Sequence, residues 1–266
     1  MKIGIVGCAG RMGRMLINEV LASAGAELAG GSEAPGSEFI GADLGALVGA
    51  DALGISAGDD AAALFEASDV VIDFTVPQAT LAHAALAQGT GTALVVGTTG
   101  LTAAHQGALE AAAKKACLIQ AANFSLGVNV LLGLVGQTAG LLGDDYDIEI
   151  VEMHHRHKVD APSGTALALG RAAADGRGVD LDKTAQRVRD GHTGERRRGD
   201  IGFATLRGGD VAGDHTVIFA ADGERIEITH KAGNRGIFAR GAVRAAMWSA
   251  GKAPGLYSMR DVLGFS

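Results

Sequence analysis

The residues best suited to chemistry lie between positions 151 and 165, where the sequence reads VEMHHRHKVDAPSGT. Three of the chain's eight histidines, His154, His155 and His157, are found here, and Lys158 follows them directly. Imidazole exchanges protons near neutral pH, and an ammonium group is a compact cation that attracts carboxylates. We therefore interpret this stretch as a site that binds a small acidic molecule and protonates it.

The histidine cluster is flanked by two elements that would hold it in place. Polar and apolar residues alternate over positions 146–153, which predicts a strand with Ile148, Ile150 and Glu152 on one face. A helix is then expected to start near Ser163 and to run through the alanine- and leucine-rich segment 166–174. A helix start binds anions through its backbone amides. The predicted order is strand, cationic corner, helix start.

Two other interpretations of these histidines remain open. A single histidine in a folded protein is more often structural or solvated than catalytic. Alternatively, His154, His155 and His157 bind zinc and serve a hydrolase, since imidazole is a common zinc ligand. No cysteine lies nearby, and two adjacent histidines rarely point to one metal. We therefore predict no metal site.

The start of the chain is typical of a dinucleotide-binding unit. An apolar strand at 2–6 is followed by a glycine-rich turn and a helix at 14–24. Gly10 would let the backbone approach a pyrophosphate, and Gly13 would let helix and strand pack closely. The spacing is G-x-x-G-x-x-G rather than G-x-G-x-x-G. The residues predicted to contact the cofactor in this turn are Gly7, Cys8, Ala9, Gly10, Arg11, Met12 and Gly13.

An acidic residue follows the second predicted strand, at 27–31. Glu33 lies 20 residues after Gly13, near the roughly 20-residue spacing expected for the acid that binds the adenosine ribose. A carboxylate there repels the 2′-phosphate of NADPH. Ala34 rather than a basic residue follows it, which leaves Arg11 as the cation able to reach a phosphate. We predict that NADH is used at least as well as NADPH.

The rest of the first half alternates strands with helices, which predicts a doubly wound parallel sheet of Rossmann type. The predicted strands are 70–74, 92–96 and 117–121, and the predicted helices are 61–67, 78–88 and 102–115. Ligands of such sheets bind beyond the carboxyl ends of the strands. The turns at 74–75, 97–99 and 121–124 follow these strand ends and are candidates to bind the nicotinamide half of the cofactor.

The second half has a different pattern, which predicts an α+β domain with an open mixed sheet. A long apolar helix is expected at 128–142, and it is too short and too polar to cross a bilayer. Antiparallel strands are expected at 203–206, 215–221 and 225–230, with helices on one face of the sheet. A helix at 239–250 returns to the first half. The predicted domains are 1–125 with 235–266 for the dinucleotide, and 126–234 for substrate and oligomerisation.

The region around the histidines closely resembles the signature of the bacterial dihydrodipicolinate reductases of lysine biosynthesis. The matching residues are Glu152, His154, His155, Lys158, Asp160, Ala161, Pro162, Ser163, Gly164, Thr165 and Ala166. The resemblance extends over nearly the whole chain and includes the G-x-x-G-x-x-G variant. It implies reduction of dihydrodipicolinate, or of its 4-hydroxy-tetrahydrodipicolinate form, to tetrahydrodipicolinate by NADH or NADPH in the diaminopimelate route. It also implies a homotetramer assembled through the open sheets.

The resemblance also suggests roles for individual residues. We expect His154 to act as general acid, and Lys158 to bind a carboxylate or donate a proton. His155, Gly164 and Thr165 are expected to bind the dicarboxylate substrate. The remaining cofactor contacts carried over from the family are Gly97, Thr98, Thr99, Ala121, Ala122, Asn123 and Phe124.

Composition limits the other classes of function. The net charge of −7 argues against a general nucleic-acid binder, and the N-terminus does not resemble a secretory signal, so we expect a cytoplasmic protein without membrane partners. A phosphorylating semialdehyde dehydrogenase would need a nucleophilic cysteine, but Cys8 lies in the glycine turn and Cys117 opens a strand. A non-catalytic NAD sensor would not need the pair of His154 and Lys158.

Overall fold

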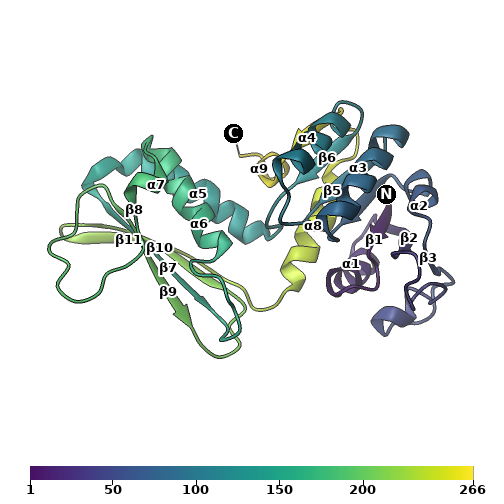
Figure 1. The fold of residues 1–266 in the computed structure, drawn as a ribbon, viewed down its shortest axis with the longest axis horizontal. Coiled ribbons are helices and arrows are strands. Elements are labelled where there is room, and N and C mark those ends of the chain that lie inside the picture. Colours follow the sequence, from purple (N-terminus) through teal and green to yellow (C-terminus); the bar gives the residue numbers. More distant parts are fainter. Residues whose placement is uncertain (266) are drawn as a thin grey trace. The chain divides into compact units, whose positions relative to one another are not determined.

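The computed structural model describes residues 1–265 and divides into two compact units (Figure 1). The first unit comprises Met1–Leu126 together with the chain from Gly236 onward, and the second comprises Gly127–Arg235. Ser266, the last residue of the predicted dinucleotide domain, lies outside the described residues.

The first unit is built on a seven-stranded sheet in the order β12-β6-β5-β4-β1-β2-β3, and all of its strand pairs are parallel. This confirms the predicted doubly wound architecture. The strands are β1 (Lys2–Val6), β2 (Glu27–Ser32), β3 (Ala57–Gly58), β4 (Val70–Asp73), β5 (Ala93–Val96), β6 (Cys117–Gln120) and β12 (Gly255–Tyr257). The helices are α1 (Arg11–Ala22), α2 (Ala61–Ala67), α3 (Pro77–Thr90), α4 (Ala103–Ala112), α8 (Gly236–Trp248) and α9 (Met259–Leu263), with a short 3-10 turn η1 (Ala46–Val48).

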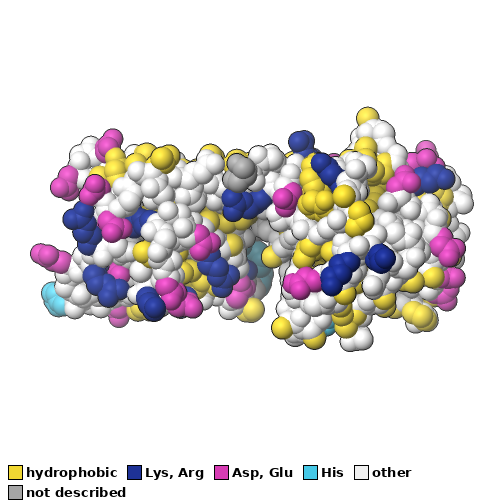
Figure 2. Space-filling view, turned by 90° about the horizontal axis from the view of Figure 1, so that it is seen from above, with side chains coloured by type: hydrophobic (Ala, Val, Ile, Leu, Met, Phe, Trp, Pro, Cys, Tyr) yellow, Lys and Arg dark blue, Asp and Glu magenta, His cyan; other side chains and the backbone are white. Residues whose placement is uncertain are grey.

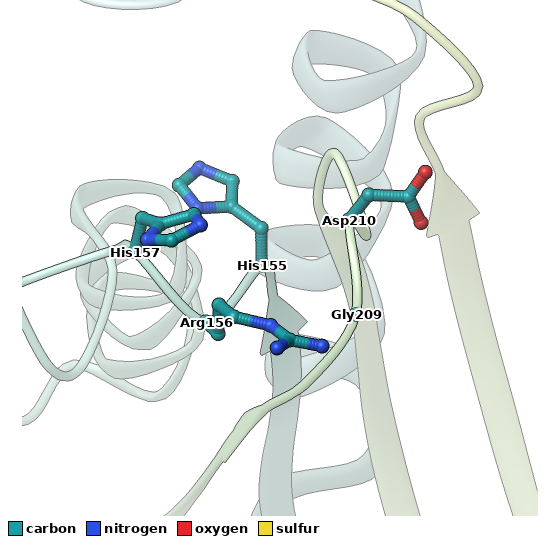
Figure 3. Close-up of a pocket in the computed structure, with 5 residues that line it drawn as sticks. All are labelled: His155, Arg156, His157, Gly209 and Asp210. Carbon is teal, nitrogen blue, oxygen red and sulfur yellow. The ribbon is translucent and has the colours of Figure 1, made fainter.

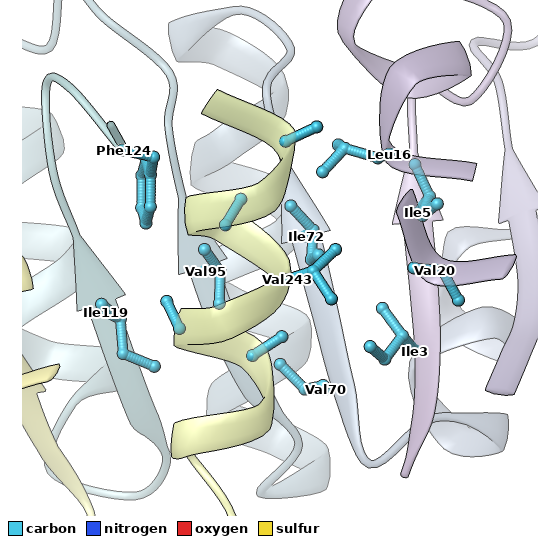
Figure 4. Packing of buried hydrophobic residues seen from close by; sticks show 14 of the residues in the cluster. Ile3, Ile5, Leu16, Val20, Val70, Ile72, Val95, Ile119, Phe124 and Val243 are labelled. Atoms are coloured by element: carbon cyan, nitrogen blue, oxygen red, sulfur yellow. The ribbon is translucent and has the colours of Figure 1, made fainter. Parts of the chain in front are cut away.

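Helices cover both faces of this sheet, which explains why its central strands are almost continuously apolar. On one face, α1 and α8 pack on alternate strand residues such as Ile5 and Ile72, as Figure 4 shows. On the other face, α2, α3 and α4 pack on the intervening residues, such as Val71 and Leu94. The predicted helix at 239–250 therefore exists as α8, and its Val243 completes the first core.

The second unit contains a five-stranded mixed sheet in the order β11-β10-β7-β9-β8. Its strands are β7 (Asp147–His154), β8 (Ala185–Gln186), β9 (Ile201–Arg207), β10 (Asp214–Ala221) and β11 (Glu224–Lys231). Its helices are α5 (Leu126–Leu142), α6 (Gly164–Arg177) and α7 (Leu181–Thr184), with a 3-10 turn η2 (Gly143–Asp145). β10 is antiparallel to both β7 and β11.

One predicted pairing in this sheet is wrong. We expected an antiparallel strand at 203–206. This strand is β9, and it runs parallel to both β7 and β8. The connection from β7 to β9 contains α6, and a helical crossover returns the chain to the end of the sheet at which the preceding strand began. Residue alternation marks β9 as a strand but carries no information about the direction of its partner.

Strand β7 separates a buried face from a more open one. Its residues alternate strictly, so that Ile148 and Ile150 are buried in the second core with α5 and α6, while Val151 is half-buried on the opposite face. Helices α5 and α6 approach closely at glycines: a Cβ on Gly176 would lie 2.2 Å from the carbonyl oxygen of Gly136.

Helix α5 is longer than the predicted apolar stretch. Together with η2 it forms a continuous helical run of 20 residues, Leu126–Asp145, which by length and composition alone could cross a membrane. The expectation that the stretch is too short and too polar is therefore wrong by these two criteria. Its residues Leu131, Val135 and Ala139 belong to the second core.

Charged side chains of both signs are interspersed on the face shown in Figure 2. On the surface of the second unit, Arg198 pairs with Asp145 at 2.6 Å and Arg225 pairs with Glu227 at 2.6 Å. Exposed pairs of this kind contribute little to stability.

Candidate active site

Glu152 lies at the centre of the polar site of the second unit. It points from β7 toward the helices and is only 1% exposed. Arg207, the last residue of β9, donates from Nη1 to Oε2 at 2.8 Å and from Nη2 to Oε1 at 3.0 Å. Burial alone raises the pKa of this carboxyl, but the hydrogen bonds from Arg207 and His154 outweigh it and leave the pKa below its ordinary value. Glu152 is therefore an anion at neutral pH.

His154 occupies the last position of β7, on the same face as Glu152, and is buried. Its Nδ1 lies 2.5 Å from Oε2 of Glu152. Because an ionised carboxylate only accepts hydrogen bonds, Nδ1 carries a hydrogen and Nε2 is the nitrogen available for proton exchange. Gly213 lies beside Nε2, and a Cβ on Gly213 would come within 2.9 Å of that atom.

Ser163 joins this site to the start of α6. Its backbone amide donates to Oε1 of Glu152 at 3.0 Å, and its hydroxyl caps the helix by accepting from the amide of Ala166 at 3.1 Å. Gly164 and Thr165, the predicted substrate contacts, are therefore the first two residues of α6. The residue that caps this helix and His154 therefore both contact the carboxylate of Glu152.

A second buried histidine adjoins His154. His215 of β10 pairs with Glu152 across the strands, and its ring centroid lies 5.1 Å from that of His154. Its Nε2 lies 2.9 Å from the Ser163 hydroxyl. Burial, helped by the neighbouring His154, lowers the pKa of His215 to about 4. His215 is therefore neutral at physiological pH.

Lys158 lies in the turn after β7. Its backbone amide donates to the carbonyl of His155, and its Nζ donates to Asp160 at 2.7 Å. The hydrogen bond from Lys158 lowers the pKa of Asp160. The backbone carbonyl of Asp160 in turn accepts from Arg207 at 2.6 Å, so Arg207 holds both this turn and Glu152.

His155 faces a different space from His154, because β7 ends between them. With Arg156, His157, Gly209 and Asp210 it lines a cavity of about 660 Å³ (Figure 3). The His155 and His157 rings lie 6.2 Å apart, and Nδ1 of His155 is buried without a hydrogen-bond partner among residues 1–265. The lining therefore combines two imidazoles and a guanidinium with the carboxylate of Asp210.

The glycine turn of the first unit has the geometry that a dinucleotide requires. Gly7 has a φ of +66°, and a Cβ on Gly13 would lie 2.2 Å from the carbonyl oxygen of Gly7. Helix α1 begins after Gly10 with no side-chain cap and no acidic residue in its first turn, so its first amides remain available to an anion. Glu33 accepts from the amide of Ala9 at 2.6 Å, which places its carboxylate at the turn.

The other residues predicted in this turn differ in their accessibility. Arg11 is exposed and Met12 is half-buried. Cys8 points into the first core, its amide donates to the carbonyl of Ser32, and burial raises the pKa of its thiol to about 11. Burial likewise raises the pKa of the Cys117 thiol to about 11. Neither thiol is suited to act as a nucleophile.

The turn after β5 is held by a buried carboxylate at the end of β4. Asp73 is 0% exposed and accepts from the Thr98 hydroxyl at 3.1 Å and from the Thr75 hydroxyl at 2.6 Å. Its other oxygen contacts Nδ1 of His83 at 2.8 Å. The Thr98 side chain is thus committed to the turn, whereas Thr99 is exposed.

Tight packing also fixes the remaining predicted cofactor contacts. A Cβ on Gly97 would lie 2.3 Å from the ring of Phe74, and Phe124 is buried 5.4 Å from the same ring. Asn123 shapes the turn after β6 by accepting from the amide of Ser125 at 2.8 Å, and Ala122 is exposed. Ala121 is half-buried against the first core. Phe124 and Thr98 therefore support the turns that carry their more exposed neighbours.

The geometry does not favour the zinc alternative. No group of three or more His, Cys, Asp or Glu side chains is placed to hold a metal within residues 1–265. Nδ1 of His154 is engaged by Glu152, and His155 faces a separate cavity. These three histidines do not share one coordination sphere.

Several residues of the site were not predicted from the sequence. Arg207 and His215 lie more than 50 residues from Glu152 and reach it only through the register of β9 and β10 with β7. Gly213 and the Asp73–His83 pair also escaped notice. The one available signal was Glu152 itself, two residues before His154 on a strand, where a carboxylate and an imidazole share a face.

Family models described as dihydrodipicolinate reductase, N-terminus and C-terminus, match residues 1–124 and 127–263. A 4-hydroxy-tetrahydrodipicolinate reductase of Alkalilimnicola ehrlichii is 57% identical over 99% of this chain and 98% of its own length. One from Rhodopseudomonas palustris is 56% identical over 99% of this chain and 97% of its own.

A solved structure shows the same fold. It is a dipicolinate-bound dihydrodipicolinate reductase from Paenisporosarcina, with a TM-score of 0.74 and 24% identity. The similarity covers 97% of each of the two chains.

Proposed function

This chain belongs to the dihydrodipicolinate reductase family, and from that premise we propose how its own residues carry out the reduction. It is an oxidoreductase of the diaminopimelate route to lysine, which reduces 4-hydroxy-tetrahydrodipicolinate with a nicotinamide cofactor. The observation that carries the mechanism is the Glu152–His154 contact of 2.5 Å at the start of α6.

The first unit binds the cofactor through the glycine turn. A bound reduced nicotinamide supplies a hydride. The free amides at the start of α1 hold the pyrophosphate, and Thr99 and Ala122 contact the nicotinamide half from exposed turns. Glu33 accepts from the adenosine ribose hydroxyls and disfavours a 2′-phosphate. NADH is accordingly used at least as well as NADPH.

His154 supplies the proton that completes the reduction. Loss of the 4-hydroxyl group as water gives the unsaturated ring, on which hydride from the cofactor would leave electron density. The N–H of Nε2 donates its proton there while Nδ1 stays bonded to Glu152. The imidazole becomes neutral in this step and regains its proton from water. General acids at such positions contribute about 10²–10⁴-fold to the rate.

The carboxylates of the substrate are held by the residues around His154. Lys158 exchanges its exposed partner Asp160 for one carboxylate. The amides and hydroxyl at Gly164 and Thr165 bind the second, and His155 adds a contact from its cavity. Charge-assisted hydrogen bonds contribute about 1.5–3 kcal/mol each, enough for a few of them to fix the ring.

The open face of the second sheet forms the oligomer interface in this proposal. Val151, Met153, Ala204, Leu206 and Ile218 lie on the side of the sheet away from α5 and α6. An apolar sheet face of this kind favours association with an identical face. We infer a homotetramer that works in the cytoplasm.

The direct test couples a synthase that generates the substrate to this enzyme and follows the oxidation of NADH and NADPH separately. His154→Gln should lower kcat/KM by about 10²-fold or more, because Gln has no acidic proton. The exposed His192 of the same unit provides a matched control, and His192→Gln should retain wild-type activity. A His154→Gln rate within a factor of about two or three of wild type would remove His154 from the acid role.

A further inference from the structure

We infer that Glu152, held by Arg207, is a positioning residue that fixes both the proton-donating nitrogen of His154 and the substrate-binding start of α6. This inference rests on the proposed function of His154 and the helix start. It adds two residues, Glu152 and Arg207, that touch neither substrate nor cofactor in that mechanism.

Each carboxylate oxygen of Glu152 contacts two hydrogen-bond donors. Oε1 accepts from Arg207 and from the Ser163 amide, both at 3.0 Å. Oε2 accepts from Arg207 at 2.8 Å and faces Nδ1 of His154 at 2.5 Å. Because the side chain is 1% exposed, bulk water cannot replace a lost partner. Each contact therefore constrains the group at its other end.

The contact with His154 selects the tautomer of the imidazole. A carboxylate accepts hydrogen bonds only, so Nδ1 retains its hydrogen whether His154 is charged or neutral. When Nε2 gives up its proton, the neutral ring is already in the Nδ1–H form that Glu152 requires. The same nitrogen is thus presented in every turnover, and the absence of a side chain at Gly213 keeps it from being crowded by a Cβ.

The contact with Ser163 fixes the helix start relative to the acid. The Ser163 amide is bonded to Glu152, and the Ser163 hydroxyl both caps α6 and contacts His215. Gly164 and Thr165 follow directly. A movement of Glu152 therefore shifts the proton donor and the proposed carboxylate-binding residues together.

Arg207 keeps Glu152 charged in a buried position. An unpaired buried carboxylate is costly, and a bidentate guanidinium both compensates its charge and sets its orientation. Nη2 of Arg207 also donates to the carbonyl of Asp160, which ties the Lys158 turn to the same carboxylate. A lysine at this position would keep the charge but lose the two-point geometry.

The experiment replaces Glu152 and measures the tautomer of His154 and the affinity for dipicolinate in addition to activity. In Glu152→Gln, the amide NH2 takes the place of one carboxylate oxygen and faces two of the four donors, so two contacts fail. We expect nitrogen-15 NMR of the His154 ring to show loss of the fixed Nδ1–H tautomer, and dipicolinate to bind about tenfold or more weakly. The kcat should fall by about 10²-fold or more, as expected when the general acid or base loses its orienting carboxylate.

Glu149→Gln is the matched control. Glu149 lies on the same strand, on the opposite face, and is also paired with arginines, Arg189 at 2.8 Å and Arg196 at 3.0 Å. This variant should keep the wild-type His154 tautomer and dipicolinate affinity. Arg207→Met should behave like Glu152→Gln, and Arg207→Lys should recover part of the loss.

The outcomes separate this inference from the proposed function. A Glu152→Gln protein with the wild-type tautomer and dipicolinate affinity within a factor of two would overturn the positioning role. If Glu152→Gln does not fold, the His154 tautomer and the dipicolinate affinity of Arg207→Met and Arg207→Lys test the positioning role instead. A wild-type enzyme that fails to reduce the substrate while Glu152→Gln still disturbs the tautomer would overturn the proposed function and leave the positioning role standing.

Discussion

His154 shows how one residue in the sequence depends on partners far from it. Its position after an alternating strand marks it as a candidate acid, and its place beside Glu152 follows from the two-residue repeat of a strand. The availability of Nε2, by contrast, depends on Gly213, 59 residues further along the chain. The histidine is therefore predictable from the sequence, but the space around its reactive nitrogen is not.

Gly213→Ala should impair proton donation without removing any catalytic group. The new Cβ would lie 2.9 Å from Nε2 of His154, and the φ of +152° at this position disfavours any side chain. We expect kcat to fall about tenfold or more, because an enzyme loses rate steeply when a reacting group is displaced. Gly233→Ala is the control, since nothing lies within 4 Å of a Cβ there. Equal kcat values for the two variants would contradict a role for this opening.

The choice of cofactor should likewise respond to a single residue. Glu33 is held at the glycine turn by the Ala9 amide, and Ala34 follows it without a charge. Ala34→Arg should raise kcat/KM for NADPH about tenfold relative to NADH, because a charge-assisted bond to the 2′-phosphate adds about 1.5–3 kcal/mol. Initial rates with each cofactor measure the ratio. The same ratio in Ala34→Gln and Ala34→Arg would argue against contact with the phosphate.

Strands and helices determine which polar groups become buried. Strand β10 places His215 beside the Ser163 hydroxyl that caps α6, and His215 is buried there. The sequence predicted the strand at 215–221, and the alternation of its residues places His215, Val217 and Phe219 on the same buried face. The antiparallel register with β7, which pairs His215 with Glu152, could not be read from either strand alone.

His215 should make the stability of the protein depend on pH in a defined window. Burial and then His154 lower its pKa to about 4, whereas an unfolded histidine titrates near 6.5. The unfolded chain therefore binds a proton below pH 6.5 that the folded chain does not. The free energy of unfolding falls as the pH drops from about 6.5 toward about 4. The contribution of His215 between pH 7 and pH 5 amounts to about 2 kcal/mol.

Denaturant unfolding of wild type and His215→Gln at pH 7 and pH 5 measures this contribution. The variant should lose less stability than wild type over that interval. His230, whose pKa is also lowered by burial, contributes in the same direction to both proteins and cancels in the difference. Since His192 is exposed, His192→Gln should retain the wild-type slope. Parallel pH dependences for His215→Gln and wild type would show that His215 is not held neutral.

At the scale of the whole molecule, the architecture was far more predictable than the contacts within it. Alternating apolar strands and helices indicated the doubly wound sheet of the first unit, and the different pattern of the second half indicated an open mixed sheet there. The parallel pairing of β9 with β7 was missed, because strand direction depends on the path of α6. That same pairing places Arg207 beside His154 and Leu206 beside Met153. The topology of one strand thus decides both a site residue and a surface residue.

Leu206 provides the test of how copies of this chain associate. It lies on the open face of the second sheet and is 48% exposed in a single chain, so an interface would cover it without repacking the core. Leu206→Lys places a charge within that interface and should convert the proposed tetramer into smaller species, because desolvating an unpaired ammonium opposes association. Leu141→Lys is the matched control, since Leu141 is 86% exposed on α5, the helix that covers the other face. Sedimentation equilibrium measures the mass of each variant. A Leu206→Lys protein that remains as large as Leu141→Lys would place the interface elsewhere.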